Sequence, residues 1–215
     1  MPIEGKTRRE VLTEFRHAEI LAAARKVFSE KGFRDATLEE IAAAAGIAKG
    51  TLYLYFENKE EIFWAAVRER LLELHARLKE VVARPGTARE RLREILRVRF
   101  EMMRRDEQFK RVYFAEFGQL CGYGGPHAEE FRQLQVEAAR LVAPVISQGI
   151  KDGELRPVPP LEAAMALTDL VRGTAALSFL GLHENHVDLE QFIFDLFWQG
   201  VRKGDSKGVR KGDSK

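Results

Sequence analysis

The segment Gly46–Glu61 (GIAKGTLYLYFENKEE) concentrates side chains that donate hydrogen bonds. Its donors are two lysines with three hydroxyl side chains between them: Lys49, Thr51, Tyr53, Tyr55 and Lys59. The segment holds no histidine and no cysteine, which most nucleophilic and metal sites need. Ammonium and hydroxyl groups are suited instead to the phosphate oxygens and base edges of a nucleic acid. The segment therefore predicts nucleic-acid contact rather than catalysis.

The residues around this segment predict a helix-turn-helix at about residues 38–54. Thr37 opens the sequence TLEE, a capping box in which the threonine hydroxyl accepts a backbone N–H three residues on. Gly46 can adopt the positive φ that a tight turn between two helices requires. Gly50 removes a side chain from the second helix, which lets its backbone come close to a duplex.

The bulk composition is that of an ordinary soluble globular protein of 215 residues, with 45% hydrophobic and 32% charged residues. The net charge of +2 is nearly balanced, so any affinity for a polyanion must come from local charge distribution. Cys121 is the only cysteine, which excludes an internal disulfide and fits a reducing compartment. With no signal peptide or membrane span in the sequence, we expect a cytoplasmic protein without a membrane partner.

Hydrophobic residues recur with helical spacing along most of the chain, and the alternation typical of strands is almost absent. We therefore predict an all-α fold of about nine helices, the first ending at Gly32. Their expected ranges are 13–31, 38–44, 48–54, 59–83, 88–105, 107–121, 126–151, 160–180 and 188–202.

Aromatic and methionine residues gather in the middle helices, and such linings suit adaptable apolar pockets. The predicted pocket residues are Phe100, Met103, Tyr113, Phe114, Phe117 and Phe131, with Glu116, His127 or Arg99 as polar anchors. The alternative is that these side chains simply fill the core. The arginine-rich run from Arg89 to Arg111 is interspersed with acidic residues, and we interpret it as a solvated, ion-paired helix face.

The last two helices predict self-association. The final helix leaves almost no polar face, so one subunit cannot bury all of its apolar side chains. A two-fold four-helix bundle made from two subunits would bury them. The predicted interface residues are Leu170, Gly173, Leu177, Phe192, Leu196 and Phe197.

These features divide the chain into an N-terminal helix-turn-helix DNA-binding domain, residues 1–58, and a larger ligand-binding and dimerisation domain, residues 59–203. Residues 204–215 are expected to form a disordered polar tail. The tail is part of a repeat, because VRKGDSK at Val201–Lys207 recurs at Val209–Lys215. Basic residues near the start, among them Arg8 and Arg16, are suited to a flexible arm that reaches DNA.

The stretch ATLEEIAAAAGIAKGTLYLYFENKEEIF (residues 36–63) resembles the tetracycline-repressor-like (TetR/AcrR) family of transcriptional regulators. The resemblance covers about Ala18–Val67, and Ile41–Lys59 follows the family pattern almost position for position. Beyond this region the chain is similar to the family only in its helical plan and in details such as KDGELRP, residues 151–157.

The resemblance implies that Thr37 and Lys59 contact phosphates, that Lys49, Thr51 and Tyr53 face the major groove, and that Tyr55 reaches the DNA backbone. It also implies an inducer pocket and a dimer interface in the C-terminal domain. We therefore predict a homodimeric repressor that binds double-stranded operator DNA and is released by an apolar or amphipathic small molecule.

Three other interpretations are open. Cys121 and His127 would suggest a thiol enzyme, but no third orienting residue is evident. His183 and His186 would suggest a metal site, but no third ligand is evident. We expect no catalytic residue, no cofactor and no metal. The third interpretation is a dimeric DNA-binding regulator without a small-molecule ligand.

Overall fold

The computed structural model describes residues 7–105, 125–179, 182 and 188–204. Within these ranges the chain forms eight helices and no β-strand, which confirms the all-α prediction. The helices are α1 (Arg8–Asp35), α2 (Leu38–Ala44), α3 (Lys49–Leu52), α4 (Lys59–Ala83), α5 (Ala88–Arg105), α7 (Ala128–Lys151), α8 (Pro160–Phe179) and α9 (Leu189–Val201). The expected helix at 107–121 lies outside the described residues. None of the described helices is long and apolar enough to cross a bilayer.

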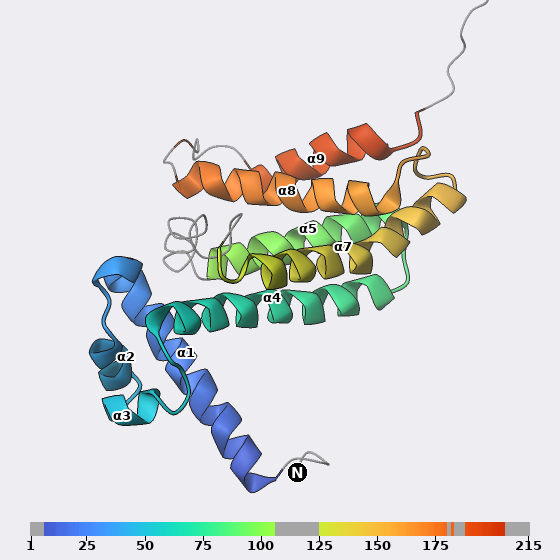
Figure 1. The fold of residues 1–215 in the computed structure, drawn as a ribbon. Coiled ribbons are helices and arrows are strands. Elements are labelled where there is room, and N and C mark those ends of the chain that lie inside the picture. Colours follow the sequence, from blue (N-terminus) through green and yellow to red (C-terminus); the bar gives the residue numbers. More distant parts are fainter. Residues whose placement is uncertain (1–6, 106–124, 180–181, 183–187, 205–215) are drawn as a thin grey trace, which may run out of the picture.

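Figure 1 shows two unequal groups of helices that share α4. The first group consists of α1, α2 and α3, which lie at the end where α4 begins. In the second group, α5 and α7 lie along α4, and α8 and α9 form the layer farthest from it. α4 has 25 residues and is therefore about 37 Å long, enough to run through both groups.

Most of the helix boundaries agree with the sequence prediction, and α1 differs most. It begins at Arg8 rather than at residue 13, because Thr7 and Glu10 form a capping box, with Thr7 N–H donating to Glu10 Oε2 at 2.7 Å. The chain leaves helical geometry at Gly32, as expected, with φ 80°, but helical assignment resumes through Asp35. Residues 8–12 are thus part of a helix and not a flexible arm.

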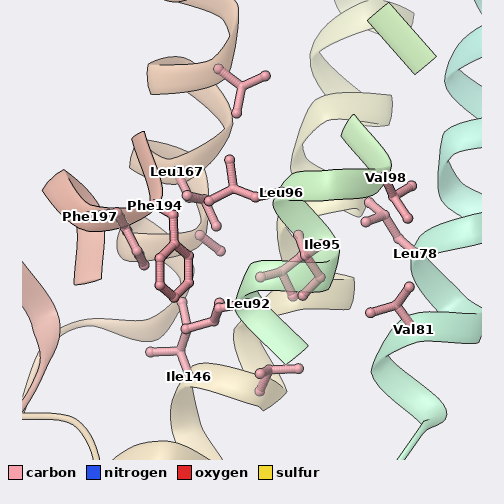
Figure 2. Packing of buried hydrophobic residues seen from close by; sticks show 14 of the residues in the cluster. Leu78, Val81, Leu92, Ile95, Leu96, Val98, Ile146, Leu167, Phe194 and Phe197 are labelled. Carbon is pink, nitrogen blue, oxygen red and sulfur yellow. The ribbon is translucent and has the colours of Figure 1, made fainter. Parts of the chain in front are cut away.

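The buried side chains form two cores, and α4 contributes to both. The head core joins α1, α2 and α3 to the first half of α4 and to the start of α7, and its largest members include Phe28, Ile41, Leu52 and Phe63. The body core joins the second half of α4 to α5, α7, α8 and α9, and Figure 2 shows Leu78, Leu92, Leu96 and Phe194 within it. A displacement of α4 would therefore move buried side chains in both cores.

The stretch KDGELRP, residues 151–157, ties three helices together. The Glu154 carboxylate accepts hydrogen bonds from the first-turn amides of α5, Ala88 N–H at 3.0 Å and Arg89 N–H at 3.3 Å. The backbone of the same stretch pairs with the end of α9, where Arg156 N–H donates to Val201 O at 2.9 Å. α7 approaches this joint closely at Gly149, where a Cβ would lie 2.5 Å from the Cβ of Ala88.

Gly149→Ala should lower the free energy of unfolding by about 1–3 kcal/mol, because the added methyl group pushes α5 and Leu155 away from α7. The matched control is Gly200→Ala in α9, where a Cβ would meet no neighbouring atom. Urea unfolding followed by circular dichroism measures both. Equal midpoints for the two variants would contradict the close packing at the joint.

Candidate nucleic-acid interface

The turn between α2 and α3 is built around Gly46, which has φ 67°. A Cβ at Gly46 would meet no other atom within 4 Å, so space does not restrict the residue type at this position. Glycine is favoured there because of the positive φ. Ile47 N–H donates to Ala42 O at 3.0 Å, and the Ile47 side chain packs against the head core. Leu52 is fully buried and fixes α3 on that core.

α3 is regular over Lys49–Leu52 only, shorter than the expected 48–54. The chain continues in tighter turns, with Leu54 N–H bonded to Thr51 O at 3.1 Å and Tyr55 N–H bonded to Leu52 O at 3.0 Å. Bonds between residues three apart are typical of the ends of short helices. Thr51 and Tyr53 therefore lie on one continuous turn of backbone.

The outer side of this turn is unusually open. Tyr53 is 48% exposed and Leu54 is 81% exposed, while Thr51 is partly exposed. Gly50 is exposed as well, and a Cβ there would meet no atom of the chain. Packing within the described chain therefore does not explain the glycine at position 50. Close approach of another molecule to the backbone would explain it.

Thr37 stands at the start of α2 and forms the expected capping box. Its hydroxyl accepts Glu40 N–H at 3.3 Å, and the Glu40 carboxylate accepts Thr37 N–H at 3.1 Å. The hydroxyl also hydrogen-bonds the Glu40 carboxylate, so a contact between Thr37 and a phosphate oxygen requires this partner to be exchanged.

Lys49 lies at the start of α3 and pairs with Glu39 of α2. The hydrogen bond that Lys49 donates to this carboxylate raises the pKa of Lys49 above its usual value, and the same bond lowers the pKa of Glu39. The Lys49 ammonium also lies 5.7 Å from the centre of the Tyr53 ring. Because the pair is exposed it contributes little stability, and Lys49 can exchange Glu39 for a phosphate at low cost.

Lys59 differs from Lys49, because its ammonium donates to backbone carbonyl groups and not to a surface carboxylate. It donates to Ala36 O at 2.8 Å and to Arg34 O at 3.0 Å, and lies 4.7 Å from the centre of the Phe33 ring. An ammonium has three donors, so two are used at the end of α1 and one is left for a phosphate. The sequence alone did not indicate this structural role.

Tyr55 is half-buried against the head core, and its side chain lies beside the N-terminal turns of α1. Together they line a surface cavity of about 530 Å³, formed by Arg8, Leu12, Thr13, Phe15, Arg16 and Tyr55. The cavity places two arginines next to a residue expected to contact the DNA backbone. Sequence reasoning noted Arg8 and Arg16 but could not place them, because their position depends on the angle of α1.

The expected pocket residues are only partly described. Phe100 and Phe131 are each 6% exposed, and Met103 is half-buried. Phe100 and Met103 belong to the body core, whereas Phe131 belongs to the head core. Tyr113, Phe114, Phe117 and the anchor Glu116 lie outside the described residues.

The expected interface residues of α8 and α9 lie mostly on the outer surface. Leu177, Phe192 and Leu196 are 40%, 52% and 51% exposed. Gly173 is exposed and Leu170 is half-buried.

The expectation for Phe197 is wrong, because its side chain is 6% exposed and packs inward beside Phe194 in the body core (Figure 2). α9 thus has an inner apolar face that the subunit uses and an outer one that it leaves uncovered.

The residues considered for catalysis and metal binding do not form a site in the described part. His127 stacks on Trp64, with ring centres 5.0 Å apart, and Cys121, His183 and His186 lie outside the described residues. Among the described residues, no group of three metal-ligating side chains occurs.

A helix-turn-helix with an open, hydroxyl-bearing second helix, carried on a larger helical body, defines a DNA-binding regulator. Two matches to known protein families identify the family of this regulator. Residues 20–66 match the bacterial regulatory proteins of the tetR family, and residues 85–176 match the tetracyclin repressor-like C-terminal domain. The chain belongs to the TetR family of transcriptional regulators and is not an enzyme.

Similar proteins agree with this assignment. The chain is 28% identical to the fatty acid metabolism regulator protein of Bacillus subtilis, over 66% of this chain and 71% of that protein. It is 30% identical to the transcriptional repressor KstR2 of Mycobacterium tuberculosis, over 66% and 70% of the two chains. A solved structure of the ketosteroid transcriptional regulator KstR2 of M. tuberculosis matches with a TM-score of 0.62 at 25% identity, covering 88% of this chain and 96% of that one.

Gly50→Ala should leave the folded chain intact or stabilise it by up to about 1 kcal/mol, because a Cβ there meets no atom and alanine favours a helix. We expect the same methyl group to weaken DNA binding by about tenfold, if Gly50 faces the duplex, because it would keep the backbone away from the phosphates and bases. Thermal unfolding and fluorescence anisotropy with operator DNA measure the two effects. Unchanged operator affinity would show that Gly50 does not face DNA.

Proposed function

We propose that this chain is a homodimeric repressor that binds a palindromic operator and is released from it by an apolar or amphipathic small molecule. The observation that carries the proposal is the open outer side of α3, where Gly50 has no role in the packing of the chain. The DNA contacts that we assign are Thr37, Lys49, Gly50, Thr51, Tyr53, Tyr55 and Lys59.

Dimer formation is supported by the outer apolar face of α8 and α9. Leu177, Phe192 and Leu196 have no cover within the described subunit, and exposed Gly173 allows another helix to approach closely. A second subunit packed on this face would bury them by two-fold symmetry. It would also set two copies of α3 about one DNA turn apart, roughly 34–36 Å, as successive major grooves require.

Control by a small molecule is supported by the way in which α4 links the two cores. Near its start, Trp64 Nε1 donates to Glu130 Oε2 of α7 at 2.7 Å, and Arg68 Nε donates to Glu130 Oε1 at 2.6 Å. A ligand that displaces α7 would pull on this contact and tilt the start of α4, which carries α2 and α3. We place the boundary between the DNA-binding and ligand-binding domains at this helix, after residue 58.

An apolar ligand is supported by the types of the candidate lining residues, Phe100, Met103 and Phe131, and by the names of the relatives. One relative is a fatty acid metabolism regulator and another is a ketosteroid transcriptional regulator. By linkage, a ligand that weakens DNA binding must itself bind the DNA complex more weakly by the same factor, typically by about 1–3 kcal/mol.

Selection of bound sequences from random DNA tests the first half of the proposal. We expect a palindromic site whose affinity falls steeply with added salt, because phosphate contacts release counterions. Compounds that raise the melting temperature are then added to the complex with the selected site. Compounds that bind tightly and leave operator affinity unchanged would support the alternative, a regulator without a small-molecule inducer.

Leu196→Asp should give folded monomers with weak operator binding, because the new charge lies on the outer face of α9 and disrupts only the subunit contact. The control Leu72→Asp changes a side chain of α4 that is 39% exposed and should remain dimeric. Light scattering at micromolar concentration gives the masses. Phe197→Asp should instead unfold the subunit, and a dimeric Leu196→Asp protein would refute the assigned interface.

A further inference from the structure

Arg99 of α5 is a buried charge without a partner among the described residues. Its side chain is 6% exposed, and Nε has no hydrogen-bond acceptor there. Two other arginines of the same run are ion-paired at the surface, Arg97 with Glu94 at 2.7 Å and Arg104 with Glu190 at 3.1 Å. The interpretation of this run as a solvated, ion-paired face therefore holds for Arg97 and Arg104 and fails for Arg99.

The other polar residues that are buried in the described part have partners. Thr168 donates to Ala164 O at 3.0 Å and Thr174 donates to Val171 O at 2.7 Å, each within its own helix. His75 of α4 interacts with the backbone of Leu134. Arg99 is thus the exception among the four, and its side chain is the one that carries a fixed charge.

The nearest charges do not neutralise Arg99. Arg172 of α8 has its own partners, Asp169 at 3.2 Å and Gln135 at 3.2 Å, and its guanidinium lies 5.8 Å from the centre of the Phe131 ring. Burial and the positive charge of Arg172 lower the pKa of Arg99 to about 10, against a smaller opposing effect of Asp169. The guanidinium is therefore still charged at neutral pH, and no carboxylate among the described residues hydrogen-bonds to its Nε.

Arg99 also lies close to His75, which is situated between the head core and the body core along α4. On α4, Leu71 packs against the head core and Leu78 is buried in the body core, with His75 between them. On α7, Phe131 and Leu134 belong to the head core and Ala138 belongs to the body core. Arg99 interacts electrostatically with His75 of α4 and with Arg172 of α8, so an anion bound to it would lie close to α4, α5 and α8.

We propose that Arg99 binds the anionic group of the inducer, a small amphiphile whose apolar chain lies against Phe100, Met103 and Phe131. This inference rests on the proposed function and adds the chemistry of the ligand. The anion is a carboxylate or a phosphate monoester, since a guanidinium fork binds either in a bidentate manner. If the buried charge gains its partner only when the ligand binds, the affinity for the ligand depends on its headgroup as well as on its apolar part.

The test uses three probes with the same chain, dodecanoate, dodecyl phosphate and 1-dodecanol, on the full-length protein by isothermal titration calorimetry. We expect one or both anions to bind about ten- to a hundredfold more tightly than the alcohol and to release operator DNA. Arg99→Met should abolish that preference without changing the affinity for 1-dodecanol. The control Arg97→Met removes an exposed charge from the same helix and should keep the preference. The two anion arms identify which headgroup is preferred.

The ligand-free proteins supply a second, independent readout. Replacing an unpaired buried charge with methionine should raise the melting temperature, whereas removing one half of an internal ion pair should lower it. Arg99→Lys keeps the charge without the fork and should retain part of the anion preference. A lowered melting temperature for Arg99→Met, or an anion preference that survives it, would overturn the inference. If neutral compounds release operator equally well from both proteins, the proposed repressor function stands and only the role of Arg99 is lost.

Discussion

The sharing of α4 between two cores is the constraint on which the rest of the structure depends. The first half of this helix closes the head core around Phe63, and the second half lies in the body core at Leu78. Glu130 fixes the start of α4 to α7 through Trp64 and Arg68, and these bonds lower its pKa even though burial acts in the opposite direction. The position of α3 is thereby defined relative to the whole body and not only to its neighbours in sequence.

The same arrangement explains why charge is distributed so unevenly. At the surface, arginines and lysines pair with carboxylates and contribute little stability, so they are free to change partners. In the interior, the four buried polar residues lie in the body and the head core is lined by apolar side chains. Among the described residues, the fully buried polar side chains therefore lie along α4, α5 and α8 and not among the residues of the head core.

Much of this could be predicted from the sequence, because local signals set the helices. Thr37, Asn58 and Thr87 each mark a helix start by side-chain capping, and α2, α4 and α5 have the expected ranges. The errors concern tertiary contacts. Phe197 has a residue type that fits either a core or a subunit interface, and its packing partners come from distant parts of the chain. The backbone partners of Lys59 at Arg34 and Ala36 were not evident from the sequence for the same reason. For Arg99 the sequence left two roles open, a polar anchor of the pocket and a member of the ion-paired surface run, because a single helix does not show what packs against each of its faces.

The pairing of Lys49 with Glu39 has a consequence for how the protein searches DNA. On an arbitrary duplex, the carboxylate competes with the phosphates for the lysine and also repels them, so loose electrostatic attachment is weakened. At a matching site, the close fit around Gly50 compensates for the lost ion pair. The head thereby carries its own counterion for Lys49, so this lysine would release fewer counterions from DNA than a free lysine would, and its share of the salt dependence would be smaller.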